Sequence, residues 1–149
     1  MEISCTVRQI LAAKGREVIT TNPDASVFDA LTIMGAHNIG ALVVVENEQV
    51  VGVISERDYS RKVVLRNRTS RETRVGEVLS QPAITVTPED GITKCMELMT
   101  VHHVRHLPVL EDGQLIGIVS IGDVVHWVIT AQRQAIEQLT GYISGGYPA

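Results

Sequence analysis

The chain contains the same sequence unit twice. A shift of 65 positions aligns residues 18–63 with residues 83–128 without a gap. The identical pairs are Ile19/Ile84, Thr20/Thr85, Pro23/Pro88, Met34/Met99, His37/His102, Leu42/Leu107, Val44/Val109, Glu46/Glu111, Gln49/Gln114, Gly52/Gly117, Ser55/Ser120, Asp58/Asp123 and Val63/Val128. One register kept over 46 positions indicates a duplication. Any fold for this chain therefore has to contain the same unit twice.

Each copy has the sequence pattern of a β-α-β-β-α unit. An extended segment ends at a proline, and apolar residues then recur at helical spacing, as at Val27, Leu31 and Met34. Two β-rich runs follow, ALVVVE and QVVGVIS in the first copy, joined by Asn-Glu there and by Asp-Gly in the second copy. A second helix is expected to begin near Ser55 and again near Ser120.

A unit of this size needs help to bury a core, and the second copy can supply it. The predicted fold class is α/β (α+β), with two β-α-β-β-α repeats that pack sheet to sheet about a pseudo-twofold axis, followed by a long C-terminal helix. Such an axis creates two equivalent clefts between the copies. A polar motif that occurs in both copies would face a ligand there.

The frame Gly-x-x-Ser-x-x-Asp ends the last strand of each copy, as GVISERD and GIVSIGD. Glycine suits a strand position that a ligand or a neighbouring backbone approaches closely, and the serine can cap the following helix. Asp58 and Asp123 then fall in the first helical turn, where a carboxylate can accept both hydroxyls of a ribose and the free N–H groups attract phosphate. The frame indicates a ribonucleotide site. The alternative is an aspartate that only stabilises the helix dipole.

Composition and charge exclude several classes of protein. The formal net charge of −4 favours neither nucleic acid nor an anionic membrane as a partner. Two cysteines are too few for a disulfide framework, and neither a signal peptide nor a membrane span is recognisable, so we expect a cytoplasmic protein. Seven of the 13 Lys and Arg residues lie between Arg57 and Arg74. An adaptor that binds nucleic acid or protein through this basic stretch is therefore the alternative function.

The segments VITTNPDASVFDALTIMGAHNIGALVVVENEQVVGVISERD and AITVTPEDGITKCMELMTVHHVRHLPVLEDGQLIGIVSIGD resemble a tandem pair of CBS domains, a Bateman module. The resemblance runs from about Val7 to Val128. It implies CBS domain 1 at 1–65 with an N-terminal helix, a basic linker at 66–74, CBS domain 2 at 75–130, and a C-terminal helix extension and tail at 131–149. It also implies a regulatory sensor without catalysis that binds AMP, ADP, ATP, NAD(H) or S-adenosylmethionine and signals through its dimer conformation or a partner protein.

The resemblance also implies which residues contact each part of the nucleotide. The ribose would be held by Asp58, Asp123, Ser55 and Ser120. The base would lie against Ile19, Thr20, Ile39, Ala41, Ile84, Thr85 and Val104. The phosphates would meet Arg57, Arg61, His102, Arg105, His106 and Gly122. Because aromatic residues make up 3% of the chain, base recognition would depend on aliphatic side chains and backbone groups.

The two copies differ at the positions that carry charge. Gly40 of the first copy corresponds to Arg105 of the second, whereas Arg57 of the first corresponds to Gly122. One cleft could therefore bind more tightly, or the two could take different ligands. Arg57 and Arg61 lie one helical turn apart and could supply the charge that the first copy lacks, or they could form a solvated basic face.

Three histidines and a cysteine invite a metal interpretation, which we do not favour. His102, His103 and His106 span a change from helix to strand, and no carboxylate or cysteine pair completes a site with Cys95. Cys95 replaces Ala30 on a helix face that should be buried, so a structural thiol is expected.

The segment after the second copy, GDVVHWVITAQRQAIEQL, continues as an amphipathic helix that contains Trp127, the only tryptophan. Its length and apolar surface suggest a homodimer interface. The alternative is that Trp127 covers the sheet of its own copy. Residues 141–149 are expected to form a loose tail.

Overall fold

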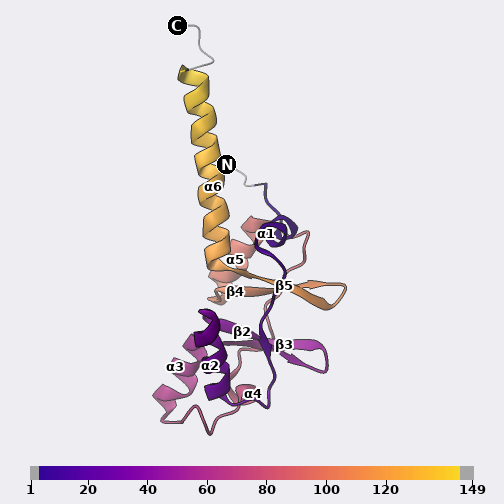
Figure 1. The fold of residues 1–149 in the computed structure, drawn as a ribbon, viewed down its shortest axis with the longest axis vertical. Helices are drawn as coiled ribbons and strands as arrows, with labels where there is room; N and C mark the ends of the chain where they lie inside the picture. The colour runs from indigo at the N-terminus through magenta and orange to yellow at the C-terminus, as the bar shows by residue number, and fades with distance from the viewer. Residues whose placement is uncertain (1–3, 145–149) are drawn as a thin grey trace.

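The computed structural model describes residues 4–144, which form twelve helices and strands (Figure 1). The N-terminal part and the first copy contain α1 (Val7–Lys14), β1 (Thr20–Thr21), α2 (Val27–His37), β2 (Ala41–Glu46), β3 (Gln49–Ser55), α3 (Glu56–Lys62) and the 3-10 helix η1 (Val64–Arg66). The second half contains α4 (Val75–Val78), α5 (Ile92–His102), β4 (His106–Glu111), β5 (Gln114–Ser120) and α6 (Ile121–Ser144). The predicted mixed fold of two repeats and a long C-terminal helix is confirmed.

The two hairpins are near copies of each other. β2 pairs antiparallel with β3, and β4 with β5, and the register shifts at the same place in both, after Val44 and after Val109. The turn residues Asn47–Glu48 and Asp112–Gly113 all have positive φ, as a two-residue turn that matches the strand twist requires. The first strand is shorter than the sequence suggests. β1 pairs with β2 over two residues, and the second copy has a single bridge between Val86 and Val109 in its place.

The two copies form two layers that meet at their sheets (Figure 1). β3 of one layer lies against β5 of the other. Each layer has its own core: one centres on fully buried residues such as Leu42 and Ile54, the other on Ile92 and Leu107. The expected sheet-to-sheet packing is confirmed, and the helices cover the outer sides.

The short helix that precedes each copy packs on the other copy. α1 precedes the first copy, but the Val7 N–H donates to the Asp90 carbonyl of the second copy at 2.8 Å. α4 precedes the second copy, but the Val75 N–H donates to the Ala25 carbonyl of the first copy, also at 2.8 Å. Because Val7 and Val75 make corresponding bonds, α1 and α4 occupy corresponding places. This exchange ties the two layers together.

The repeated glycines make room for these exchanged helices. A Cβ atom on Gly52 would lie 2.5 Å from the Ser80 carbonyl oxygen and closer still to the side chain of Leu79. A Cβ atom on Gly117 would lie 2.6 Å from the Leu11 side chain. The predicted close approach of a neighbouring backbone is therefore confirmed at Gly52, whereas at Gly117 the close neighbour is the side chain of Leu11.

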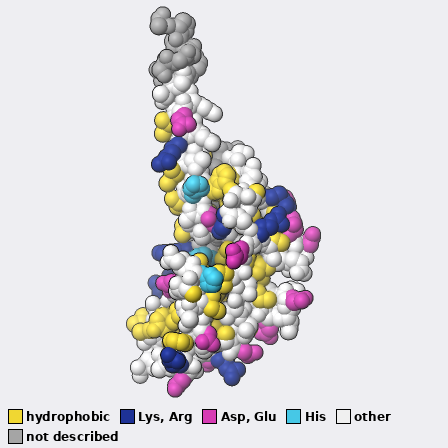
Figure 2. Space-filling view, viewed as in Figure 1, with side chains coloured by type: hydrophobic (Ala, Val, Ile, Leu, Met, Phe, Trp, Pro, Cys, Tyr) yellow, Lys and Arg dark blue, Asp and Glu magenta, His cyan; other side chains and the backbone are white. Residues whose placement is uncertain are grey.

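Helix α6 leaves the body of the protein as a long projection (Figure 1). Trp127 near its start packs against the core of the second copy, as the alternative interpretation of this residue proposed. Exposed apolar side chains nevertheless run along the helix, and Figure 2 shows hydrophobic atoms along one of its edges. The exposed apolar residues of α6 are Ile121, Val125, Ile129, Ile136 and Leu139. The predicted tail is wrong for residues 141–144, which are helical, and residues 145–149 lie outside the described part. None of the described helices is both long and apolar enough to cross a membrane.

Candidate functional site

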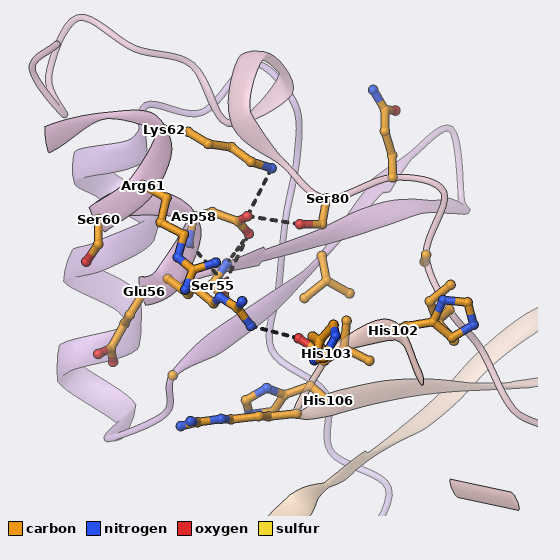
Figure 3. A pocket seen from close by; sticks show the side chains of 18 of the residues that line it. Ser55, Glu56, Asp58, Ser60, Arg61, Lys62, Ser80, His102, His103 and His106 are labelled. Carbon is orange, nitrogen blue, oxygen red and sulfur yellow. Dashed lines mark hydrogen bonds and ion pairs between the residues drawn. The ribbon is translucent and has the colours of Figure 1, made fainter. Parts of the chain in front are cut away.

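A cleft of about 1000 Å³ lies between the two copies, beside Asp58 (Figure 3). We call it the Asp58 cleft. The first copy contributes the end of β3 and the exposed side of α3, and the second copy contributes its first segment and the turn from α5 into β4. The lining residues are Gly40, Val53, Ser55, Glu56, Arg57, Asp58, Ser60, Arg61, Lys62, Ser80, Gln81, Pro82, Ala83, Ile84, His102, His103, Val104, Arg105 and His106.

The Asp58 carboxylate is held in place by three hydrogen bonds and an ion pair, and Asp58 is 5% exposed. Its Oδ2 atom accepts from the backbone N–H of Ser55 at 2.9 Å and lies 3.1 Å from the Ser55 hydroxyl. Its Oδ1 atom accepts from the Ser80 hydroxyl at 2.9 Å and lies 3.1 Å from the Lys62 ammonium (Figure 3). The carboxylate is therefore an oriented acceptor at the wall of the cleft, and each of its oxygens already has partners.

Ser55 ends β3 and caps α3, as the sequence predicts. The Asp58 N–H lies 3.2 Å from the Ser55 hydroxyl, and the Glu56 N–H donates to the Gly40 carbonyl at 3.0 Å. The second copy repeats both bonds, from Asp123 to Ser120 and from Ile121 to Arg105. Two N–H groups of each first turn are thus already used. Our expectation that free N–H groups of this turn would attract phosphate is wrong for these two positions in both copies.

Cationic side chains supply the positive charge of the cleft instead. Arg57 donates to the His103 carbonyl across the cleft at 2.9 Å, so it connects the two copies. Lys62 donates to the Val78 carbonyl at 2.9 Å, and Arg61 and Arg105 also line the cleft. Against these four cations stand the carboxylates of Asp58 and Glu56. The excess of positive charge suits an anionic ligand.

The second copy provides the apolar wall. Ile84 and Val104 are partly buried side chains that pack against the core of that copy and also line the cleft. Ala83 and Pro82 extend this wall along the chain. A flat uncharged group can lie here without an aromatic partner.

The cleft brings together about half of the predicted site residues. These are Ser55, Asp58, Ile84, Val104, Arg57, Arg61, His102, Arg105 and His106. The others do not line it: Ser120, Asp123, Ile19, Thr20, Ile39, Ala41, Thr85 and Gly122. Ile19 and Ile39 pack against the core of the first copy. The cleft therefore combines Asp58 of the first copy with Ile84 and Val104 of the second copy, a combination that the sequence interpretation had not specified.

Asp123 has different partners from Asp58. Its Oδ2 atom accepts from the Ser120 N–H at 2.8 Å and from the Lys14 ammonium of α1 at 2.7 Å. Burial opposes ionisation of this carboxyl, but the hydrogen bonds from Lys14 and Ser120 outweigh it and lower the pKa of Asp123. We call the region around Asp123, Ser120 and Gly122 the Asp123 seam. None of these three residues lines the Asp58 cleft or the smaller hollow beside Arg57 and Met99.

His106 lies between the Asp58 cleft and the Asp123 seam. It lines the cleft, and in the hairpin it pairs with Ser120. Burial, the Lys14 ammonium and Arg105 lower the pKa of His106, whereas Asp123 acts in the opposite direction. The lowered pKa favours the neutral imidazole at pH 7.

The sequence interpretation missed several residues of the cleft, among them Lys62, Ser80 and Gln81. Lys62 could have been found, because it follows Asp58 by four positions on a predicted helix, where an ion pair is expected. Ser80 lies in the segment between the copies and reaches Asp58 because it bridges to Val53 on β3. No local sequence pattern predicts that contact.

The basic stretch from Arg57 to Arg74 does not form one surface. Its first part lines the cleft, whereas Arg68 pairs with Glu77 at 2.7 Å and Arg71 lies over the ring of Phe28 at 3.9 Å. Arg74 lies 3.6 Å from Asp24. These contacts divide the stretch among separate partners, so they give no support to an adaptor that uses it as a continuous patch.

Comparison with known proteins gives two matches to one family model, the CBS domain, at residues 7–64 and 75–130. The mitochondrial CBS domain-containing protein CBSX3 of Arabidopsis thaliana is 41% identical over 153 residues, which cover 97% of this chain and 74% of that protein. Inosine-5'-monophosphate dehydrogenase of Methanocaldococcus jannaschii is 30% identical over 133 residues, but these cover 84% of this chain and 26% of the enzyme.

Solved structures share the fold. A putative signal-transduction protein with CBS domains from Burkholderia ambifaria is 47% identical, with a TM-score of 0.82 over 85% of this chain and 96% of that one. A CBS domain protein from Pyrobaculum aerophilum in complex with AMP has a TM-score of 0.70 over 79% of this chain and 88% of that one. At 24% identity, the second likeness is one of fold.

Proposed function

We propose that this chain, which belongs to the CBS-domain family, is a regulatory module that binds an adenosine nucleotide in the Asp58 cleft. CBS domains account for both family-model matches, and the dehydrogenase relative is matched over 26% of its length, so its activity is not carried over. The observation that carries the proposal is the arrangement of this cleft. An oriented carboxylate from the first copy faces an apolar wall and Arg105 from the second.

The size and chemistry of the cleft fit the three parts of a nucleotide. Its volume of about 1000 Å³ is at the upper end for small-molecule pockets and accommodates a mono- or polyphosphate. The adenine would lie against Ile84 and Val104, and the phosphates would meet Arg57, Arg61 and Arg105. These residue roles are part of the proposal, and AMP, ATP and NAD(H) are the candidate ligands of the cleft. The Pyrobaculum aerophilum protein of the same fold was solved with AMP, which makes AMP the natural first probe.

The ribose would bind Asp58 by exchange of partners. Oδ1 accepts from the Ser80 hydroxyl and pairs with the Lys62 ammonium, so the ribose hydroxyls would replace these two groups. Both released groups stay in the cleft, where the Lys62 ammonium can pair with a phosphate. Hydrogen bonds to a charged acceptor contribute about 1.5–3 kcal/mol each. The exchange therefore keeps the number of ion pairs and adds those of the phosphate with arginine.

Such a ligand would touch both copies at once, which suits a sensor. Asp58 belongs to the first copy and Arg105 to the second, so a bound nucleotide favours one relative placement of the two layers. We propose that this change is read by a second copy of the chain or by a partner protein at the exposed apolar side of α6. A cytoplasmic location stays a prediction, and one relative is described as mitochondrial.

Binding of AMP to ligand-free protein tests the proposal. The protein is unfolded and refolded to remove carried-over nucleotide, and AMP is then titrated by calorimetry and by thermal shift. At a hundredfold excess over Kd, binding stabilises the fold by about 2.7 kcal/mol, which corresponds to a rise in Tm of roughly 5–10 °C. The substitution Asp58→Asn should lower AMP affinity roughly 10- to 100-fold, because it removes the charged acceptor.

The matched control is Asp24→Asn, which changes an exposed aspartate of the same copy whose only described ion pair is with Arg74. Its AMP affinity should equal that of the wild type. The proposal fails if AMP, ATP, NADH and S-adenosylmethionine all leave the Tm unchanged. The assignment of the ribose fails if Asp58→Asn binds AMP as tightly as Asp24→Asn.

A further inference from the structure

We infer that each chain binds a single nucleotide, because Lys14 closes the Asp123 seam against a second one; this inference rests on the proposed function. The duplicated aspartates suggest two equivalent sites, and the structure departs from that symmetry at one helix. Lys14 is thus the residue that decides how many nucleotides the module holds.

The two halves differ first in the lengths of the exchanged helices α1 and α4. α1 has eight residues and α4 has four, although both start with corresponding bonds to the opposite copy. Leu11 and Leu79 fill corresponding places against Gly117 and Gly52. After Leu79 the chain leaves the helix and presents the hydroxyl of Ser80. After Leu11 the helix continues and ends at Lys14.

The extra turn of α1 places the Lys14 ammonium on Asp123. The Nζ atom lies 2.7 Å from Asp123 Oδ2 and donates to the Ile118 carbonyl at 3.0 Å. The side chains of Lys14 and Asp123 are 31% and 21% exposed, so the pair is partly shielded from water. A neutral ribose that replaced this ammonium would leave Lys14 without its carboxylate partner, which is unfavourable.

Lys62 does not close the Asp58 cleft in the same way. It belongs to α3, lines the cleft itself, and lies among the arginines that would meet a phosphate. When a ribose takes its place on Asp58, the phosphate of the same ligand offers Lys62 a new anion. Lys14 has no such replacement from the corresponding positions, because none of the four cations of the Asp58 cleft has a counterpart with a fixed positive charge beside Asp123.

The loss of these cations follows from the alignment of the two copies. Each of the four Lys and Arg residues that line the Asp58 cleft corresponds to a residue without a fixed positive charge in the other copy: Arg57 to Gly122, Arg61 to His126, Lys62 to Trp127, and Arg105 to Gly40. The two seams are therefore chemically different. Both have an aspartate paired with a lysine, but only the Asp58 cleft also has arginines that a phosphate could meet.

The number of bound nucleotides and nucleosides tests this inference. AMP and adenosine are the two probes: AMP supplies the phosphate that Lys62 needs in the Asp58 cleft, and adenosine probes the Asp123 seam without depending on the missing cations. Equilibrium dialysis with radiolabelled AMP should give one site per chain for the wild type, and Lys14→Met should bind one adenosine more per chain than the wild type. The double variant Lys14→Met/Asp123→Asn should lose that additional adenosine. Lys94→Met is the matched control, since Lys94 forms an ion pair with Asp90 on the surface at 3.1 Å, and it should bind no additional adenosine.

Two AMP sites in the wild type would overturn the inference, and so would the absence of an additional adenosine in Lys14→Met. A second readout does not depend on any nucleotide. Mass spectrometry after brief treatment with an amine-acylating reagent should show slower modification of Lys14 than of Lys94, and Asp123→Asn should accelerate the modification of Lys14. Equal rates for both lysines, unchanged by Asp123→Asn, would overturn the contact on which the inference depends. If Lys14 is protected but neither adenosine nor AMP binds, the proposed function fails instead, and the inference falls with it.

Discussion

The substitution Gly52→Ala should destabilise the fold more than the matched substitution Gly117→Ala. At Gly52 the added methyl group would lie 2.5 Å from the Ser80 carbonyl oxygen, well inside the 3.5–4.0 Å of a normal contact. This carbonyl cannot turn away freely, because it accepts from the Val53 N–H at 3.1 Å while the Ser80 N–H donates to the Val53 carbonyl at 2.9 Å. Backbone therefore has to move.

At Gly117 the nearest atoms are the two ends of the Leu11 side chain, at 2.6 and 2.8 Å. A side chain can change rotamer, and α1 can shift outward by a small amount. Overpacking in a core costs about 1–3 kcal/mol. We expect Gly52→Ala in the upper half of that range and Gly117→Ala at about 1 kcal/mol, a difference in the free energy of unfolding of about 1–2 kcal/mol.

Urea denaturation followed by far-UV circular dichroism measures both values, and thermal unfolding should place Gly52→Ala several degrees below Gly117→Ala. Because the shifted backbone carries the Ser80 hydroxyl away from Asp58, Gly52→Ala should also change AMP affinity. Equal costs for the two variants, or a larger cost for Gly117→Ala, would refute the description of how the exchanged segments pack on the sheets.

Three further predictions follow from the charges and the burial of single residues. Burial and the Lys14 ammonium lower the pKa of His106 in the folded protein, so the unfolded chain binds more protons, and the free energy of unfolding should decline as the pH falls below the ordinary histidine pKa of 6.5. In urea titrations at several pH values, His106→Gln should lessen this decline. An unchanged dependence of the free energy of unfolding on pH would contradict the assignment of this effect to His106. Burial raises the pKa of Cys95 to about 11 and also raises the pKa of Cys5, so iodoacetamide at pH 8 should label neither thiol until the protein is unfolded. Mass spectrometry measures the labelling, and rapid labelling of the native protein would contradict this prediction. Arg105→Met should weaken AMP binding about tenfold and leave adenosine binding unchanged in calorimetry, and an equal loss for both ligands would show that Arg105 does not meet the phosphate.

The repeat made most of the fold predictable. A gapless register over 46 positions fixes the same element order twice, and hairpin turns such as Asp-Gly specify local backbone geometry. The serine caps at Ser55 and Ser120 were predictable for the same reason, because the capping hydroxyl and its N–H partner are three residues apart. These features depend on neighbours in the sequence.

The site contacts that no local pattern predicts lie outside the aligned copies. Lys14 and Ser80 belong to the segments that precede each copy, and those segments pack on the opposite layer. Their contacts depend on the exchange of α1 and α4, which no local pattern specifies. The alignment suggested two equivalent acids, but Asp58 and Asp123 have different partners. The exchange of α1 and α4 accounts for this difference, because these helices have unequal lengths. Length differences outside a repeat can therefore make its two copies chemically unequal.

The most direct test of a nucleotide site at Asp58 is a crystal structure of the protein grown with AMP at saturating concentration. We expect both ribose hydroxyls within hydrogen-bonding distance of the Asp58 carboxylate, the adenine against Ile84 and Val104, and the phosphate among Arg57, Arg61 and Arg105. An AMP molecule whose ribose contacts Asp123 instead, or an Asp58 cleft that stays empty while AMP is present in excess, would contradict the account.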